Sequence, residues 1–252
     1  MAACKRRKGV RIQVRNIGSE NIWFEFAGHR CTEYDVRMLS MPTRPHPARK
    51  GNLIDVPGRD GKLFVDGEAY DRILVTLRVI AVGDIDAVNG WLTGSGLLIF
   101  GDFPNRAYHA SVTKEFSMSN RIARLRGQEF TITFDCDPFR YEYPEPEPVS
   151  ISSSGEIINN PGTVYSLPKV KITGNGDFTL VVNGYQIDGY GITGGAIIDC
   201  ELMDVFNLDE TEILNSRFTI DEFPRLDPGA NIVSWMGDGI SSVEITPRWR
   251  FL

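Results

Sequence analysis

A two-residue alternation of apolar and polar side chains is the feature that most constrains how this chain folds. It occurs in residues 10–14, 73–79 and 130–136, with polar residues such as Thr131 and Asp135 at the intervening positions. Successive side chains of a strand point to opposite faces, so this pattern indicates strands with one buried face, as in antiparallel sheets. The residues predicted to face the interior are Val10, Ile12, Val14, Ile73, Val75, Leu77, Val79, Phe130, Ile132, Phe134 and Cys136.

Residues 84–94 break the alternation. Their apolar side chains, Ile85, Val88, Trp91 and Leu92, recur at helical spacing. Asp84 is suited to cap the N-terminus and Gly94 to follow the C-terminus, which predicts one amphipathic helix of about ten residues. We expect this helix to pack against a sheet through its apolar face.

A Pro- and Ser-rich stretch, "YPEPEPVSISSSG", then interrupts the pattern. Its three alternating prolines remove backbone donors, so no sheet interior can run through them. The charge balance also changes here, from 21 Lys/Arg and 16 Asp/Glu through residue 140 to 6 and 17 afterwards. We therefore expect a first domain at 1–142, a linker at 143–158 and a second domain at 159–252.

The second half again has the composition of a β-structure. Asn175-Gly176 lies between two alternating runs and predicts a hairpin, because both turn residues favour positive φ. Further strands are expected at 196–200, 216–220, 231–235 and 242–251. Several short strands separated by Gly, Pro, Asn and Asp predict a β-sandwich.

Composition excludes several classes of protein. A net charge of −6 gives little reason for tight nucleic-acid binding, and the basic "KRRK" near the start is expected to be a solvated terminus. No apolar run is long enough for a membrane span, and no secretory signal follows the basic residues. Four widely spaced cysteines and three separated histidines do not predict a metal site; reduced thiols in a cytoplasm are the default.

The sequence gives no support for catalysis or for a cofactor. "GRDGK" has the wrong spacing for a phosphate loop, and the surrounding carboxylates lack the order of a calcium loop. Asp135 and Asp137 share one face of a strand, but nothing indicates the burial that paired catalytic acids need. No catalytic, cofactor or metal residue is therefore assigned, and the expected class is a protein that is not an enzyme.

Two roles are possible for the aromatic residues in the second half of the sequence. Tyr185, Tyr190, Trp235 and Trp249 could form a platform that stacks on sugars, or they could pack in the core and at sheet edges. Core packing is the default. Tyr185, Tyr190 and Trp235 are the candidate glycan contacts.

The order of segments over residues 22–252 resembles the distal tail protein (Dit) family of bacteriophages with long, non-contractile tails (siphoviruses). A helix containing "WL" and the turn "VPGRDGKL" belong to this order. The other segments are "FEFAGHRCTEYDVRM", "LIFGDFPNRAYHASV", "FTITFDCDPFRY", "NPGTVYSLPKVKITGNGDFTLVVNG", "AIIDCELMDVF" and "FPRLDPGANIVSWMG". The basic leader, residues 1–14, precedes the usual start of the family.

The resemblance implies a β-rich belt domain that assembles six copies into a ring, followed by a galectin-like or carbohydrate-module-like sandwich. It implies a structural baseplate hub at the virion tail tip, assembled in the host cytoplasm. Implied partners are the tail tube protein, the tail-associated lysin or fibre, the tape-measure protein and a receptor-binding protein, with DNA passing through the lumen. The alternative function is an adhesin that binds host wall polysaccharide through the sandwich.

The charged turn at residues 56–67, "VPGRDGKLFVDG", is expected to connect two extended segments of the ring domain. Arg59 and Asp60 are candidates for a subunit boundary, where charge-assisted hydrogen bonds fix the register between identical neighbours. Solvated turn charges are the competing explanation.

Overall fold

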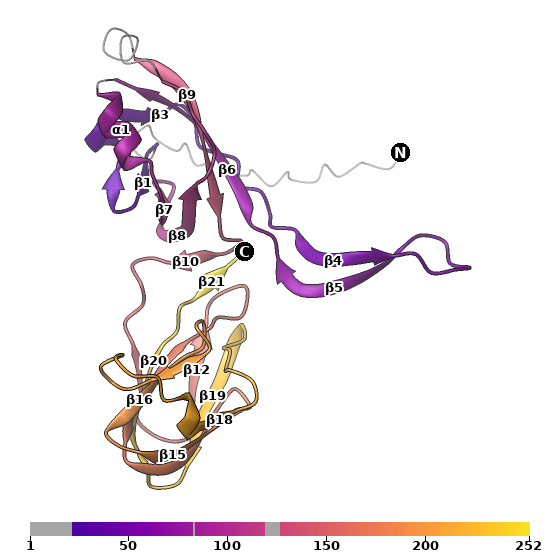
Figure 1. Ribbon diagram of the computed structural model, residues 1–252, viewed down its shortest axis with the longest axis vertical. Coiled ribbons are helices and arrows are strands. Elements are labelled where there is room, and N and C mark those ends of the chain that lie inside the picture. The colour runs from indigo at the N-terminus through magenta and orange to yellow at the C-terminus, as the bar shows by residue number, and fades with distance from the viewer. Residues whose placement is uncertain (1–21, 83, 119–126) are drawn as a thin grey trace, which may run out of the picture.

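The structure is a computed structural model that describes residues 22–82, 84–118 and 127–252. Figure 1 shows three parts: a unit of curved sheet with one helix, a long hairpin that projects from it, and a second unit of strands below. Strands dominate and the described residues contain one α-helix, which confirms the expected mainly β class. The predicted strand at residues 10–14 lies outside the described residues.

The first unit is a nine-stranded antiparallel sheet with the order β2-β1-β7-β8-β9-β6-β3. Its short strand β10 pairs with β8 and with the last strand of the chain, β21. The bounds are β1 Phe24–Phe26, β2 His29–Arg30, β3 Val36–Met38, β6 Ile73–Ala81, β7 Ser95–Phe100, β8 Phe103–Val112, β9 Gln128–Cys136, β10 Arg140–Glu142 and β21 Arg250–Phe251. A 3-10 turn, η2 (Cys31–Tyr34), joins β2 to β3.

The alternating residues of β6 and β9 face the core of this unit, as predicted. Side chains from Ile73 to Val79 and from Phe130 to Cys136 are buried at every second position. Helix α1 (Ile85–Trp91) covers the core with Ile85, Val88 and Trp91. It is seven residues long, shorter than expected, although Asp84 caps it by accepting a hydrogen bond from the backbone N–H of Asp86 at 3.0 Å.

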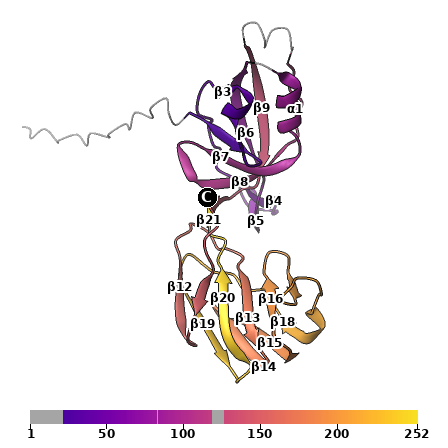
Figure 2. The same cartoon turned by 90° about the vertical axis from the view of Figure 1, so that its left-hand side faces the viewer.

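The second unit is a sandwich of two five-stranded sheets that enclose a separate hydrophobic core (Figure 2). One sheet has the order β11-β20-β13-β16-β17 and the other β12-β19-β14-β15-β18. The bounds are β11 Val149–Ile151, β12 Glu156–Asn160, β13 Lys169–Gly174, β14 Gly176–Val182, β15 Tyr185–Ile192, β16 Gly195–Asp199, β17 Asp204–Phe206, β18 Phe218–Ile220, β19 Gly229–Met236 and β20 Ile240–Thr246. A 3-10 turn, η3 (Asn215–Arg217), precedes β18.

The predicted hairpin at Asn175-Gly176 is wrong. Strand β13 pairs with β16 and β20 in one sheet, whereas β14 pairs with β15 and β19 in the other, so the chain crosses between sheets at this turn. The hairpin of this region joins β14 to β15 through Asn183-Gly184, where φ is +50° and +87°. A second Asn-Gly pair therefore makes the tight turn, since both of its residues adopt the positive φ that the turn needs.

The segment expected to be a linker, residues 143–158, contains strand at residues 149–151 and from residue 156 onwards. Strands β11 and β12 begin there and pair with β20 and β19, and Ile151 and Ile158 are buried in the sandwich. The prolines keep Tyr143 to Pro148 free of strand, as their missing donors require. The last strand was also not expected to leave the sandwich, yet β21 joins the sheet of the first unit.

The third part is a hairpin arm, which we define as β4 (Arg49–Ile54), β5 (Leu63–Tyr70) and the turn between them. Figure 1 shows the arm extending away from both units, and β4 and β5 form a two-stranded sheet of their own. No side chain of β4 is buried, and only Tyr70 of β5 is partly shielded. The arm therefore has no core of its own within the chain.

Candidate functional site

The arm carries apolar side chains on both of its faces. Leu53 pairs with Phe64 on one face, and Ile54 pairs with Leu63 on the other. The exposed fractions of Leu53 and Phe64 are 63% and 48%, and Val65 is 44% exposed. An isolated two-stranded hairpin is marginally stable in water, and contiguous exposed apolar residues mark interaction surfaces. The arm thus has the properties of a surface that a partner covers.

Charged pairs fix the base of the arm. The Arg49 guanidinium donates to the Asp66 carboxylate, with Nε at 3.1 Å, and also reaches the Tyr70 hydroxyl at 3.1 Å. Hydrogen bonds from Arg49 and from the backbone N–H of Glu68 lower the pKa of Asp66. The Tyr70 ring meets Phe139 edge-on at 5.5 Å, which links the arm to the junction between the two units.

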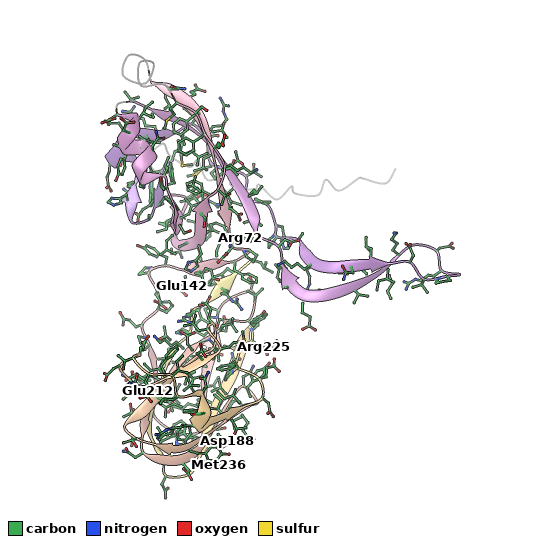
Figure 3. The ribbon with its side chains drawn as sticks, in the orientation of Figure 1. Arg72, Glu142, Asp188, Glu212, Arg225 and Met236 are labelled. Atoms are coloured by element: carbon green, nitrogen blue, oxygen red, sulfur yellow. The ribbon has the colours of Figure 1, made fainter. Side chains whose placement is uncertain are left out.

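Arg72 anchors the chain where the arm returns to the sheet (Figure 3). Its Nε donates to Asp135 at 2.6 Å, its Nη2 donates to the Asp135 carbonyl at 2.9 Å, and Nη1 pairs with Asp137. The hydrogen bonds that Arg72 donates to the two carboxylates, first of all the one to Asp135, raise the pKa of Arg72. The two carboxylates considered as a catalytic pair thus both bind one guanidinium that orients the arm.

Arg59 and Asp60 lie in the turn at the tip of the arm and are exposed. Gly58 and Gly61 flank them with φ of +78° and +73°, a conformation that glycine adopts without strain. The backbone N–H of Arg59 donates to the Val56 carbonyl at 3.2 Å and closes the turn. Their place at a subunit boundary stays a prediction.

The structure separates the aromatic residues considered for glycan binding. Trp235 packs against the sandwich core, and Trp249 is 7% exposed. Tyr185 lies at one end of β15, and Cζ of Arg225 lies over the Tyr185 ring at 5.7 Å from the ring centre. Burial raises the pKa of the Tyr185 hydroxyl. Tyr190 lies near the other end of β15 and is 52% exposed.

Tyr190 lines an open groove of about 370 Å³ together with Met236, Asp177 and Asp188. Figure 3 shows Asp188 and Met236 close together at the far end of the sandwich. Hydrogen bonds from Thr179 at 2.6 Å and from Gln186 at 2.9 Å lower the pKa of Asp188. The groove offers one half-exposed ring and two carboxylates.

The junction of the two units is held by the last strand. Arg250 is buried, donates through Nε to the Tyr165 carbonyl at 2.8 Å, and lies over the rings of Phe139 and Tyr165 at 4.6 and 4.5 Å. Arg106 of β8 lies over the Phe251 ring at 3.6 Å. Side chains from both units therefore enclose this strand and fix their orientation.

A buried ion pair supports the sandwich side of this junction. Asp199 accepts two hydrogen bonds of 2.8 Å from Arg248 and others from the backbone N–H groups of Glu201 and Leu202. Burial opposes the ionisation of Asp199, but Arg248 and these N–H groups together hold its pKa below the ordinary value. The pair is thus ionised at neutral pH.

The described cysteines do not have the properties of reactive thiols. Cys31, Cys136 and Cys200 are buried and free, and burial raises the pKa of Cys136 to about 12. Among the residues that the structure describes, no three His, Cys, Asp or Glu side chains gather as a metal site would require. The same part of the chain has no helix of the length and apolar character that crossing a membrane requires.

Sequence reasoning missed the apolar faces of the arm. A signal was present, because Leu53-Ile54 and Leu63-Phe64-Val65 are contiguous apolar runs without alternation on either side of a glycine-rich turn. Such runs predict a strand that is covered on both faces. The chain itself covers neither face, which only the tertiary structure reveals.

The overall fold, a mainly β sheet unit followed by a sandwich, is similar to that of a solved phage protein. This solved structure, one of those that match, is the Dit protein (gp 19.1) of SPP1, described as a paradigm of the hub adsorption apparatus in phages that infect Gram-positive hosts. The match has a TM-score of 0.67 at 16% sequence identity and covers 92% of this chain and 99% of that chain. The resemblance to the Dit family is confirmed at the level of the fold.

Comparison with protein-family models and with curated proteins gave no match.

Proposed function

We propose that this protein is a structural hub of a phage tail tip and acts without catalysis. Copies assemble into a ring, six in number by analogy with the expected family, through interfaces that close by rotation. The ring joins the tail tube to the tail-associated lysin or fibre, accommodates the tape-measure protein and supports the receptor-binding apparatus. It is assembled in the host cytoplasm, and DNA passes through its lumen.

The single observation that carries this proposal is the arm, whose two faces are apolar and exposed. A neighbouring copy that covers Leu53 and Phe64 on one face and Ile54 and Leu63 on the other would remove this surface from water. An arm that reaches away from its own subunit makes a heterologous contact, the kind of interface that generates rings. The Dit fold supports the same conclusion.

We also propose that the chain divides near residues 143–148 into a ring-forming unit and a peripheral sandwich. The two hydrophobic cores support this division because they share no residue: the described part of the first spans Phe24 to Cys136, and the second spans Ile151 to Phe251.

Native mass spectrometry and negative-stain imaging of the purified chain test the assembly. We expect six-fold rings for the wild type and monomers for the double variant Leu53→Asp/Phe64→Asp, because buried carboxylates would oppose the interface. The matched control is Leu202→Asp/Met203→Asp, an apolar pair on the sandwich that is 61% and 65% exposed. Rings that persist in the arm variant, or a wild type that stays monomeric at high concentration, would contradict self-assembly through the arm.

A second candidate function, binding of host wall polysaccharide, is favoured by the groove at Tyr190. A half-exposed ring beside two carboxylates provides a stacking surface and hydrogen-bond acceptors for sugar hydroxyls. Glycan-array binding that disappears in Tyr190→Ala but persists in Tyr185→Phe supports this function. Equal binding by both variants, or no binding by the wild type, excludes it at this groove.

A further inference from the structure

A pocket of about 150 Å³ lies at one side of the sandwich, between the edge strands of its two sheets. Val205 of β17 lines it from one sheet, and Phe218 and Ile220 of β18 line it from the other. Figure 2 shows β18 on the side of the sandwich opposite to β12. None of the functions proposed above uses this pocket.

The apolar walls of the pocket are held in place by their neighbours. The Phe218 ring meets the buried Phe178 ring edge-on at 6.1 Å. Met203 also lines the pocket and is 65% exposed, next to Leu202 at 61%. Asp199 holds the turn that carries both residues, because its carboxylate accepts from two backbone N–H groups of that turn at 3.0 and 3.2 Å. An apolar cavity of about this size holds a benzene ring in another protein, so one phenyl or aliphatic side chain fits here.

The edge of β18 beside the pocket is open. The Phe218 N–H donates to the Asn215 carbonyl, away from β15, so Phe218 and Ile220 direct their backbone groups outward. Outside the pairing with β15, no hydrogen bond joins Ile220 to any residue that the structure describes. The edge of β17 is closed instead, since the Leu214 N–H donates to the Val205 carbonyl at 2.7 Å. An open edge strand can pair with an added strand.

The surroundings of the pocket are acidic. Residues 199–223 contain eight Asp/Glu and one Lys/Arg. Asp221 and Glu222 directly follow β18 and are exposed, and Asp204 accepts a hydrogen bond at 2.7 Å from Asn215, a residue of the pocket. None of these three acids forms an ion pair within the described part of the chain. Charge complementarity therefore favours a partner with Lys or Arg beside its apolar side chain, and it disfavours a second copy of this acidic sandwich.

We propose that this edge of the sandwich binds an extended, basic segment of another protein, with one phenyl or aliphatic side chain in the pocket and the backbone of the segment paired with β18. Main-chain hydrogen bonds and the buried side chain provide affinity, and the surrounding acids select a cationic partner. This proposal does not depend on ring formation.

A synthetic peptide is the probe: acetyl-Lys-Thr-Lys-Phe-Lys-Thr-Lys-amide with a fluorophore. Fluorescence anisotropy with the full-length chain at low salt should give a dissociation constant below about 1 mM. Replacing the Phe of the peptide by Ser should weaken binding about tenfold, because no apolar side chain then fills the pocket. Alternate N–H groups of a strand face the same edge, so peptides N-methylated at the odd or at the even residues should differ in affinity at least about fivefold.

Leu202→Asp/Met203→Asp should weaken binding of the probe about tenfold and leave the assembly state of the chain unchanged, which separates this proposal from ring formation. The matched control is Ile157→Asp/Ile232→Asp. These two residues are 58% and 54% exposed and pair across β12 and β19, at the opposite edge of the sheet that contains β18. This control should bind the probe as the wild type does.

Asp221→Asn/Glu222→Gln should weaken binding about fivefold at low salt and by less at high salt, because it removes charges that attract the lysines. Glu145→Gln/Glu147→Gln changes the net charge equally at two exposed acids of the connection and is the matched control.

Cross-linking locates the bound probe. A peptide with benzoylphenylalanine in place of its Phe should react on irradiation with Met203 or with residues 218–223. Cross-links elsewhere, equal weakening by the two aspartate variants, or no binding by the wild type below about 1 mM overturn the proposal. Loss of assembly in Leu202→Asp/Met203→Asp overturns it as well, because the surface then binds a second copy of the chain.

Discussion

Strands β5 and β6 are neighbours in the chain, separated by Asp71 and Arg72, yet they have opposite environments. Every second residue of β6 is buried in the sheet unit, whereas β5 is exposed almost throughout. Both form antiparallel ladders, so backbone pairing does not distinguish them. The difference lies in the side chains. The alternation in β6 matches a strand with one face buried in the core. The contiguous apolar residues of β5 lie on both faces of the arm, and the chain covers neither face.

The largest difference in stability between the sheet unit and the arm is expected from a substitution in the core of the sheet unit. Phe134 is fully buried, with its ring centre 5.0 Å from that of Phe26 and 6.0 Å from that of Phe24. We expect Phe134→Ala to lower the free energy of unfolding by about 3–5 kcal/mol because it opens a cavity. The control Phe64→Ala on the arm should change it by less than about 0.5 kcal/mol under conditions that keep the chain monomeric. Denaturant titration measures both, and equal losses would show that the arm is part of the folded core.

The junction is expected to give the next largest effect. Arg250→Ala removes a buried guanidinium that lies over two rings and donates to the Tyr165 carbonyl. We expect a loss of about 2–4 kcal/mol, as for other buried cations with several partners, and a larger radius of gyration in solution scattering. Arg217→Ala is the control, because this exposed arginine has one backbone partner, the Gly191 carbonyl. An unchanged radius in Arg250→Ala would argue against its role in orienting the units.

The contribution of the Asp199–Arg248 pair to the free energy of unfolding should depend on pH. The pKa of Asp199 is lowered in the folded chain, so its stabilisation is present above the unfolded value of about 4 and disappears as pH falls through the folded pKa. Asp199→Asn should therefore lower the free energy of unfolding by about 1–3 kcal/mol at neutral pH. This loss is smaller than for an isolated buried pair because Arg248 still forms an ion pair with Glu201 in the variant.

This cost should shrink progressively as pH falls below about 4 and should vanish once pH has passed the folded pKa of Asp199, where the wild type also loses the charge. Glu244→Gln, which breaks the exposed pair with Lys171, should cost less than about 0.5 kcal/mol. A cost of Asp199→Asn that is independent of pH would mean that hydrogen-bond geometry, and not charge, stabilises the junction.

The tip of the arm should give the smallest effect on stability. Arg59→Glu reverses one exposed charge and should change the free energy of unfolding by less than about 0.5 kcal/mol. If Arg59 lies at a subunit boundary, the same change weakens ring assembly in native mass spectra, most strongly at low salt. Lys114→Glu, also exposed, is the matched control. Intact assembly in Arg59→Glu would remove this residue from the interface.

Local sequence signals were sufficient for the class of fold and for the buried faces of β6 and β9. The alternation assigned the buried side chains from Ile73 to Val79 and from Phe130 to Cys136, and Asp84 marked the start of α1, because these signals depend on neighbouring residues. The order of segments also pointed to the Dit fold, which the structural match confirms. Only part of the candidate site was predicted from the sequence. The charged turn at Arg59 and Asp60 was identified, whereas the exposed apolar faces of the arm beside it were not.

Tertiary structure decided which strands pair and which surfaces remain uncovered. The two Asn-Gly pairs of the sandwich have the same local signal, yet only Asn183-Gly184 closes a hairpin, while Asn175-Gly176 carries the chain from one sheet to the other. The return of β21 to the first sheet and the exposure of Leu53 and Phe64 likewise depend on residues far away in the chain. Strand propensity and alternation are local properties, whereas pairing and burial are settled by contacts between distant segments.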